Sequence, residues 1–531
     1  MEGTGDVDFT YAEANAEVTR LIESYSKTGL SIGDRVAMLM GNQAEFFMHW
    51  FALNSYGVSV VPVNAELQPD EMAYLLENSD ARLAVSLADK IHLLQNTVDQ
   101  FKLNIPVAAD TSVQDLVLPA PKSKAVDNAS TQNIGLETEC ALLYTSGSTG
   151  KPKGCVLSND YFVLSGAWYR DAQDYCKLVK GKERLITPLP LTHMNAMACS
   201  TMGMVMTGGC LVQLDRFHPR SWVKSVRDSK ATVLHYLGVM PAILLNIEQG
   251  DIDVNLGDQI KFGFGAGVNP KHHAPFEKRF GFPLIESWGM TESGITNCIT
   301  AIREPRHVGT SCIGKLPSYL QVKLVDEAGT EVEQGYQGEL LVRASGDNPR
   351  RGFFTEYYKN PEATAETWEG GWLHTGDVLR QAEDGSYHFV DRIKNVIRRS
   401  GENISALEVE ACLSLDANIG QIAVTAVPDE IRGDEVFASV ILKNNTTDSS
   451  RALDPSTLEQ LANSIFLSAA AQLTYYKLPG YIAFVSELPL TASNKPQRAE
   501  LKKMAHAIVA DFDQQSTCFD LRSLKKKSVN K

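Results

Sequence analysis

The chain has 531 residues, of which 44% are hydrophobic and 21% charged, a composition typical of a globular protein with more than one folding unit. Its net charge of −14 argues against a nucleic-acid partner or an anionic membrane surface. The nine cysteines form no C-x-x-C pair, no apolar run is long enough to span a membrane, and the acidic first residues do not resemble a signal peptide. We therefore expect a cytoplasmic protein without disulfides, as a monomer or homodimer.

The first half of the chain alternates helix-like and strand-like segments. Thr10 and Glu13 have the spacing of a capping box, which predicts a helix that runs to Glu23. The apolar pattern then predicts strands over 35–40, 58–63 and 83–86, helices over 45–53 and 69–76, and, in a second run over 185–264, strands at 209–214 and 231–237. Such alternation is typical of α/β layers with largely parallel sheets.

From Gly314 to Phe389 the pattern changes to short strands between glycine turns, at 320–325, 338–343 and 386–390. After Asp391 a helix over 406–415 and strands over 422–427 and 436–442 are expected. We therefore predict an α/β protein with two sheet-bearing α/β subdomains, a small distorted β-barrel and a small α+β domain at the C-terminal end. The basic tail with Lys525 to Lys527 is expected to be disordered.

A loop rich in glycine and hydroxyl groups follows the apolar residues 141–143, from Tyr144 to Gly154. Glycines let backbone N–H groups approach an anion, and the hydroxyls and lysines add donors and positive charge. The loop is not a Walker A motif, because Thr145 stands where that motif needs glycine and Pro152 follows Lys151. We expect polyphosphate binding, rather than a flexible linker, by Thr145, Ser146, Gly147, Ser148, Thr149, Gly150, Lys151 and Lys153.

Further segments carry glycine turns, chemically active side chains, or both. In chain order they are Pro188–His193, Phe262–Pro270, Ser287–Ser293, His374–Asp377, Asp391–Lys394, Arg399–Ile404 and Leu488–Glu500. Their carboxylates suit Mg²⁺ or a ribose diol, because Mg²⁺ prefers oxygen ligands and a carboxylate offers two acceptors.

Together, and in this order, the loop and these segments resemble the adenylate-forming superfamily, which includes acyl-CoA synthetases, aryl-CoA ligases, adenylation domains and luciferases. Residues 35–81 and 190–214 look most like the crotonobetaine/carnitine-CoA ligase branch. The resemblance implies a mobile C-terminal domain that swings between two half-reactions. The domains would then be residues 1–391 for ATP and acid, a hinge at 392–394, a mobile domain at 395–508, and the tail at 509–531.

The resemblance also implies how ATP is bound. Thr291 would donate to the α-phosphate, and Glu292 with Thr145 would hold Mg²⁺. Asp377 would accept both ribose hydroxyls and Arg392 would contact the ribose. The adenine would lie against Gly265, Ala266, Gly267, Ser287, Trp288, Gly289 and Met290.

Three residues towards the C-terminus match positions that act in the two half-reactions. Lys394 matches the hinge, and Gly401 lies in a segment similar to the loop that enters the site for thioester formation. Lys495 matches the catalytic lysine that contacts the carboxylate and the α-phosphate. Asn494 precedes it where the family has glycine, and Asn tolerates the left-handed backbone that such a turn needs.

The resemblance implies an AMP-forming acid–thiol ligase that uses ATP, Mg²⁺ and coenzyme A on a small or medium carboxylic acid. His193 would gate the acyl pocket, whereas His235 is expected to pack in the core. Met194 disfavours an α-amino acid, because a thioether cannot neutralise a buried ammonium. Alternatives are a ligase for an aryl or longer fatty acid, a luciferase-like oxygenase, and an adenylation enzyme that loads a carrier protein. A non-catalytic nucleotide-binding protein is less favoured, since Lys495, Glu292 and Asp377 are all present.

Overall fold

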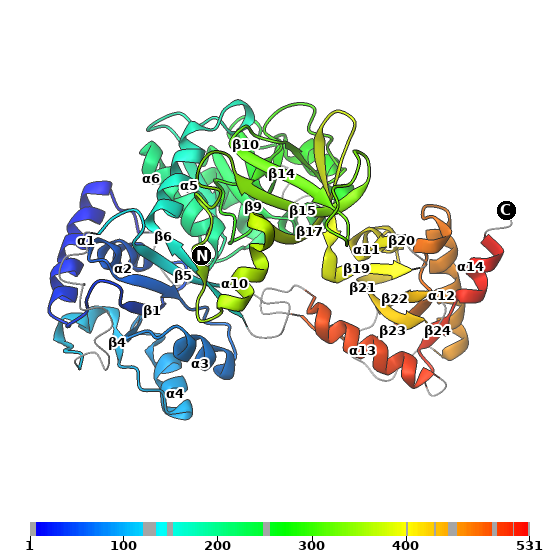
Figure 1. Cartoon of the computed structure of the whole chain (residues 1–531), viewed down its shortest axis with the longest axis horizontal. Coiled ribbons are helices and arrows are strands. Elements are labelled where there is room, and N and C mark those ends of the chain that lie inside the picture. The colour runs from blue at the N-terminus through cyan, green and yellow to red at the C-terminus, as the bar shows by residue number, and fades with distance from the viewer. Residues whose placement is uncertain are drawn as a thin grey trace. The chain divides into compact units, whose positions relative to one another are not determined.

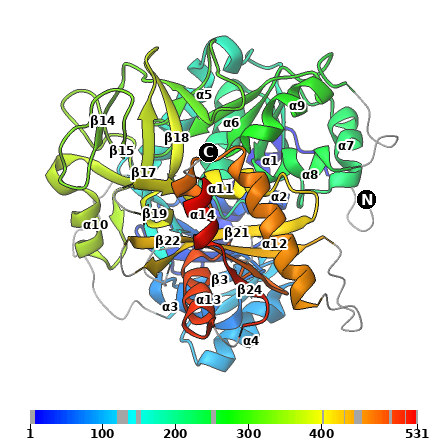
Figure 2. The same cartoon turned by 90° about the vertical axis from the view of Figure 1, so that its right-hand side faces the viewer.

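The structure is a computed structural model, shown from two sides in Figures 1 and 2. It describes residues 7–119, 134–145, 152–247, 255–399, 402–429, 432–443, 454–490, 496–512 and 515–528. The chain divides into two compact units, residues 1–322 with 341–374 and residues 323–340 with 375–531. No helix among the described residues is long and apolar enough to cross a membrane.

The first unit contains a seven-stranded mixed sheet. Its strands, in spatial order, are β16 (Glu356–Tyr357), β6 (Lys153–Ser158), β5 (Glu139–Thr145), β2 (Ser59–Pro62), β1 (Arg35–Leu39), β3 (Leu83–Ser86) and β4 (Val107–Ala109). The strands from β5 to β4 run parallel, whereas β6 is antiparallel to both β5 and β16. The helices in this part of the chain are α1 (Tyr11–Ser26), α2 (Ala44–Ser55), α3 (Pro69–Asn78), α4 (Ile91–Phe101), α5 (Asn159–Asp171) and α10 (Pro361–Thr367).

A six-stranded sheet follows in the same unit. Its spatial order is β12 (Ile299–Thr300), β11 (Leu284–Trp288), β10 (Phe262–Ala266), β9 (Val233–Leu237), β7 (Arg184–Thr187) and β8 (Cys210–Gln213). All neighbours are parallel except β12, so β9, β10 and β11 end at one edge of the sheet. The helices here are α6 (Met202–Thr207), α7 (Trp222–Asp228), α8 (Val239–Leu245) and α9 (Pro270–Phe280).

The β-rich segment contains β13 (Cys312–Lys315), β14 (Leu320–Val325), β15 (Gln337–Ala344), β17 (Leu373–Gln381) and β18 (Ser386–Arg392). Strands β17 and β18 pair antiparallel with Asp377 opposite Arg392. This register places both predicted ribose-binding residues on adjacent strands.

The second unit ends in a smaller α+β domain. Its sheet has the order β20 (Glu402–Ser405), β19 (Val396–Arg399), β22 (Gly433–Leu442), β23 (Tyr481–Phe484) and β24 (Cys518–Asp520), and β21 (Ile419–Asp429) also pairs with β22. The helices are α11 (Ala406–Leu413), α12 (Pro455–Ala470), α13 (Arg498–Ala510) and α14 (Arg522–Ser528). Buried side chains such as Val409, Phe466 and Ile482 form its core.

The fold class predicted from the sequence is confirmed, and so are many of its elements. Thr10 and Glu13 form the predicted capping box, and strands β3 and β14 have the predicted bounds. The tail differs from the prediction, because residues 518–520 and 522–528 form β24 and α14. The reason is burial, since Leu521 and Lys525 are each only 3% exposed.

Asp391, at the end of β18, is fully buried and orders the chain around it. Its carboxylate accepts hydrogen bonds from the backbone N–H of Arg392 at 2.7 Å and of Leu407 at 3.1 Å. The side chains of Ser405 and Asn395 donate to it at 2.9 and 3.2 Å. These bonds fasten the end of β18 to the start of α11.

We predict that Asp391→Asn destabilises the second unit by about 2–3 kcal/mol, because an amide cannot accept all the bonds that the buried carboxylate accepts. Urea unfolding followed by circular dichroism measures the loss. The control is Glu383→Gln, at an exposed position between β17 and β18, which should change stability by less than about 0.5 kcal/mol. An unchanged urea midpoint for Asp391→Asn would contradict this role.

Candidate active site

The phosphate side of the site is built on β5, β6 and β16. Thr145 ends β5 opposite Lys153 of β6, and its hydroxyl lies 3.5 Å from the Lys153 carbonyl oxygen. The Lys153 ammonium lies over the ring of Tyr357, 4.8 Å from its centroid. The Tyr357 hydroxyl donates to Oε1 of Glu292 at 2.6 Å. The strands thereby bring together Lys153 and Glu292, which the sequence separates widely.

Cys155 connects the two predicted magnesium ligands. Its buried thiol interacts with both the Thr145 hydroxyl and the Glu292 carboxylate. Burial strongly raises the pKa of this thiol, the negative charge of Glu292 raises it further, and the hydrogen bond with Thr145 opposes the rise. Thr145 and Glu292 therefore both lie within reach of one protonated thiol.

These residues fit a magnesium site. Glu292 is 6% exposed, and the Tyr357 hydroxyl fixes one of its carboxylate oxygens. Burial raises the pKa of Tyr357, so its hydroxyl keeps the proton that it donates. A carboxylate and a hydroxyl are hard oxygen ligands, and Mg²⁺ completes such a set with water and phosphate oxygens. Tyr357 was missed by the sequence analysis, because nothing local links it to Glu292.

The backbone of the predicted Thr291 and Glu292 is held from two sides. The Tyr161 hydroxyl donates to the Thr291 carbonyl oxygen at 3.0 Å, and the backbone N–H of Phe354 donates to the Glu292 carbonyl oxygen at 2.9 Å. Several other predicted residues, together with the neighbouring Asn494, lie outside the described part of the chain: Ser146, Gly147, Ser148, Thr149, Gly150, Lys151, Gly401 and Lys495.

The ends of β9 and β10 approach each other closely at the predicted adenine side. A Cβ at Gly265 would lie 2.3 Å from the Tyr236 carbonyl oxygen, and a Cβ at Gly238 would lie 1.7 Å from that of Gly267. Only glycine fits at these contacts. Gly238 was missed by the sequence analysis, because its partner is distant in sequence. The predicted run of Gly265, Ala266 and Gly267 is thus held by backbone packing.

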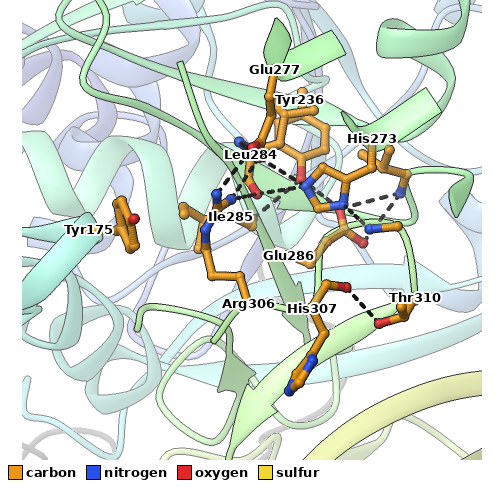
Figure 3. A network of polar contacts seen from close by, with 12 residues as sticks. Tyr175, Tyr236, His273, Glu277, Leu284, Ile285, Glu286, Arg306, His307 and Thr310 are labelled. Carbon is orange, nitrogen blue, oxygen red and sulfur yellow. Dashed lines mark hydrogen bonds and ion pairs between the residues drawn. The ribbon is translucent and has the colours of Figure 1, made fainter. Parts of the chain in front are cut away.

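The carboxylate of Glu286, on β11, accepts hydrogen bonds from donors around the run Gly265–Gly267 (Figure 3). Tyr236, Gly265 and Glu286 lie side by side on three adjacent strands, so the absence of a side chain at Gly265 lets the Tyr236 hydroxyl reach Oε1 of Glu286 at 2.6 Å. The N–H groups of Gly267 and Val268 donate to the same carboxylate at 2.9 and 3.3 Å. Burial raises the pKa of Glu286, and these donors oppose the rise. Glu286 was missed, although an acidic residue in an apolar strand is a usable signal.

The residues that follow Glu286 run along the end of β11. The Ser287 hydroxyl shares a hydrogen bond with that of Thr300 at 2.9 Å, and Trp288 is 5% exposed. After Gly289, the N–H of Met290 donates to the Ser293 hydroxyl at 3.1 Å. The predicted aromatic residue beside adenine therefore lies in a segment fixed by side-chain hydrogen bonds.

The predicted acyl gate, His193, is exposed and precedes a π-helical turn that begins at Asn195. His235 is fully buried, as expected, and its Nδ1 lies 2.9 Å from Asn195 Oδ1 and 2.7 Å from Ser200 Oγ. Its Nε2 lies 3.0 Å from the Tyr169 hydroxyl. Burial lowers the pKa of His235 to about 3, so the ring is neutral. Asn195 is thus oriented by a neutral polar cluster.

The predicted ribose-binding pair lies in the second unit. Asp377 is 3% exposed, and the Nε of Arg392 lies 3.1 Å from its Oδ1. The N–H of Asp377 donates to the Thr375 hydroxyl at 3.1 Å, which fixes the turn. Lys394 follows in the short helical turn Ile393–Asn395.

Arg498 anchors the chain just after Lys495. Its guanidinium donates to both carboxylate oxygens of Glu410, at 2.5 and 2.9 Å, and to the Val424 carbonyl oxygen at 2.8 Å. Such a bidentate pair is strong and directional. It ties the start of α13 to α11 and β21. Glu410 was missed by the sequence analysis, as was this role of Arg498.

A second carboxylate network lies next to Glu286 (Figure 3). Glu277 of α9 accepts hydrogen bonds from Arg306 at 2.6 Å and from the N–H of Leu284 at 2.8 Å, and Nε2 of His273 lies 3.1 Å away. Burial by itself would raise the pKa of Glu277, but His273, Arg306 and the Leu284 N–H outweigh it and lower the pKa to about 2. Glu277 thereby joins α9 to β11.

This pKa predicts a pH-dependent stability. The folded pKa of Glu277 lies below its ordinary value of 4.5, so its contribution is present above pH 4.5 and is lost as the pH falls towards 2. Glu277→Gln should therefore destabilise the protein clearly at neutral pH, and the difference from the unchanged protein should shrink below about pH 4. Urea unfolding across this range measures it. Glu366→Gln, at an exposed position of α10, is the control, and a pH-independent difference for Glu277→Gln would contradict the assignment.

Comparison with known proteins identifies the family. The family model described as AMP-binding enzyme matches residues 3–354, and that described as AMP-binding enzyme C-terminal domain matches residues 408–495. The crotonobetaine/carnitine–CoA ligase of Citrobacter koseri is 29% identical over 503 residues, which are 93% of each chain. The corresponding Salmonella typhimurium protein is 28% identical with the same coverage.

Solved structures share the fold. The o-succinylbenzoate CoA synthetase of Bacillus subtilis, in complex with its acyl-adenylate intermediate, has a TM-score of 0.76, 23% identity and 94% coverage of both chains. ATP-bound MatB from Rhodopseudomonas palustris has a TM-score of 0.77, 22% identity and the same coverage. Since the first family model alone spans more than half of the chain, this protein belongs to the AMP-binding enzymes, the adenylate-forming superfamily that its motifs resemble.

Proposed function

We propose that this protein is an AMP-forming ligase that activates a small or medium carboxylic acid with ATP and transfers the acyl group to coenzyme A. The observation that carries the proposal is the cluster of Lys153, Tyr357 and Glu292 beside the predicted phosphate loop. The match to both family models, the second of which reaches Lys495, supports it. So do the CoA ligases that match over 93% of the chain.

In the first half-reaction a carboxylate oxygen of the acid attacks the α-phosphorus of ATP. A bond forms between that oxygen and phosphorus, and the bond from the α-phosphorus to the bridging oxygen breaks, so pyrophosphate leaves with the electron pair. The step needs positioning and charge neutralisation, and no protein nucleophile. Lys153 supplies positive charge on the phosphate side, and Glu292 with Thr145 would hold Mg²⁺. Bound Mg²⁺ would neutralise phosphate charge.

In the second half-reaction the thiol sulfur of coenzyme A attacks the carbonyl carbon of the acyl-adenylate. The carbon–sulfur bond forms, the carbon–oxygen bond to phosphate breaks, AMP leaves, and the thiol proton passes to solvent. Lys495 serves the first step in this proposal, and the loop with Gly401 serves the second. Arg498, three residues after Lys495 in the sequence, is held by Glu410.

The residues after the gate favour a polar acid. Asn195 is held by His235, which is itself fixed by Ser200 and Tyr169. An amide next to the gate favours an acid with hydrogen-bonding groups over a long alkyl chain, which cannot satisfy the amide. The names of the relatives make crotonobetaine and carnitine the first acids to test.

We predict that the protein releases pyrophosphate from ATP with Mg²⁺ in the presence of a small polar acid, and forms AMP in a CoA-dependent way. A panel should contain crotonobetaine, carnitine, short aliphatic acids, aryl acids and long fatty acids. Pyrophosphate release and mass spectrometry of the acyl-CoA provide the measurement. Glu292→Gln should lower the rate by about 10²-fold or more, because it removes the charged oxygen ligand.

Three alternatives have their own signatures in this panel. A preference for aryl or long fatty acids would correct the substrate class. Adenylate formation without transfer to coenzyme A would favour a carrier protein as acceptor. No AMP formation with any acid would overturn the proposed function.

We predict that Lys495→Ala lowers the rate of acyl-adenylate formation by about 10²–10³-fold, because the transition state loses a positive charge. Thioester formation from supplied acyl-adenylate should remain. The matched control is Lys502→Ala, at an exposed position on α13, which should leave both half-reactions unchanged. Equal loss of both half-reactions in Lys495→Ala would refute this division of roles.

A further inference from the structure

The last described segment of the chain is an integral part of the C-terminal sheet. Strand β24 pairs antiparallel with β23, and the N–H of Leu521 donates to the Gly480 carbonyl oxygen at 2.8 Å. Leu521 is 3% exposed and packs into the core of the domain. Both β24 and α14, labelled in Figure 1, lie beyond residues 408–495, where the C-terminal family model matches.

A lysine of helix α14, Lys525, forms an ion pair with the buried carboxylate of Glu435. Lys525 is 3% exposed and Glu435 is fully buried, and the Lys525 ammonium forms an ion pair with Oε1 of Glu435. The Nε of Arg399 donates to both carboxylate oxygens of Glu435 at 3.0 Å. Burial lowers the pKa of Lys525 to about 8 although Glu435 opposes the shift, so the ammonium keeps its charge at neutral pH. One buried carboxylate thus joins two cations from distant parts of the chain.

The position of Glu435 is fixed by backbone as well. A Cβ at Gly480 would lie 2.3 Å from Cγ of Glu435, so this side chain lies directly against backbone. The N–H of Val436 donates to Oε1 of Glu435 at 2.9 Å. The carboxylate therefore has little freedom while both cations hold it.

Arg399 is the last described residue of β19, which pairs antiparallel with β20 as a hairpin. It pairs with Glu402 across the hairpin and with Gly433 of β22. Arg399 also begins the segment Arg399–Ile404, whose sequence resembles the loop for thioester formation. The base of this hairpin is thus linked, through Glu435, to α14.

We propose that Lys525 is a positioning residue for thioester formation, because through Glu435 and Arg399 it fixes the base of the β19–β20 hairpin. The inference rests on the proposed function, in which this hairpin serves the second half-reaction. Without the ammonium, Arg399 is the cation that Glu435 retains among the described ion pairs, and the carboxylate can turn away from the geometry that orients Arg399. Adenylate formation does not use this hairpin and stays intact.

The test is Lys525→Met, which keeps the length of the side chain and removes its charge. Thioester formation from supplied acyl-adenylate and coenzyme A should fall about tenfold, while ATP–pyrophosphate exchange with the accepted acid should stay within about twofold. Lys525→Arg should restore most of the loss because it keeps the charge. The matched control is Lys503→Met on α13, where the lysine is 74% exposed and pairs only with Glu500 among the described ion pairs.

Two further measurements keep the test decisive if Lys525→Met folds poorly or if the acid that the protein accepts is not identified. Arg522→Ala, at a side chain 40% exposed, removes the ion pairs of Arg522 with Asp520 and with Asp429, and Asp429 keeps Arg432 as a partner. The variant loosens the start of α14 without touching Lys525 and should show a smaller loss of the same kind. Hydrogen exchange should rise at residues 396–405 in Lys525→Met and stay constant in α12. This readout needs no substrate.

The outcomes separate the two proposals. If no acid gives an acyl-adenylate in the unchanged protein, the proposed function fails, and hydrogen exchange still decides whether Lys525 holds the hairpin. If the unchanged protein performs both half-reactions, an equal loss of both in Lys525→Met, unchanged thioester formation, or unchanged exchange at the hairpin would overturn the role of Lys525.

Discussion

A carboxylate that leaves water must be surrounded by donors, or its burial costs several kcal/mol. This chain buries carboxylates next to turns and strand ends where its chemistry is expected, and each one gathers donors from separate parts of the chain. Glu286 holds the end of β10, Glu292 is fixed by a tyrosine from β16, Asp391 joins β18 to α11, and Glu435 joins the hairpin base to α14. Because removing any one donor leaves a buried charge poorly satisfied, these carboxylates restrict how far the adjoining loops can move.

The arrangement at β9, β10 and β11 shows how register and composition act together. Tyr236, Gly265 and Glu286 occupy neighbouring positions across the three parallel strands. A side chain at position 265 on β10 would lie between Tyr236 and Glu286. Because this residue is glycine, the Tyr236 hydroxyl reaches the Glu286 carboxylate across β10. The glycine run therefore allows the polar contact that holds its own backbone in place, in addition to the adenine contact that the proposed function gives it.

The sequence predicted features that depend on local pattern. Strands β3 and β14 and the capping box of α1 follow from apolar alternation and from a three-residue spacing, and the structure has them where they were expected. Long-range partners do not follow from such patterns. Tyr357 lies 65 residues from Glu292, and Arg498 lies 88 residues from Glu410, so several tyrosines or acids were equally available for each contact. Only the pairing of the strands selects among them.

The C-terminal tail shows a different limit of sequence reasoning. Three consecutive lysines favour a solvated end, and this composition outweighed the apolar residues just before them. Leu521 and Lys525 are four residues apart, a spacing that places both on one face of a helix, and both are buried. The aliphatic stem of a lysine can cover apolar surface, but its ammonium is stable there only beside a carboxylate. Glu435 meets that need from a strand 90 residues earlier. A lysine at core spacing after apolar residues therefore indicates a buried helix end whose acidic partner has to be sought elsewhere in the chain.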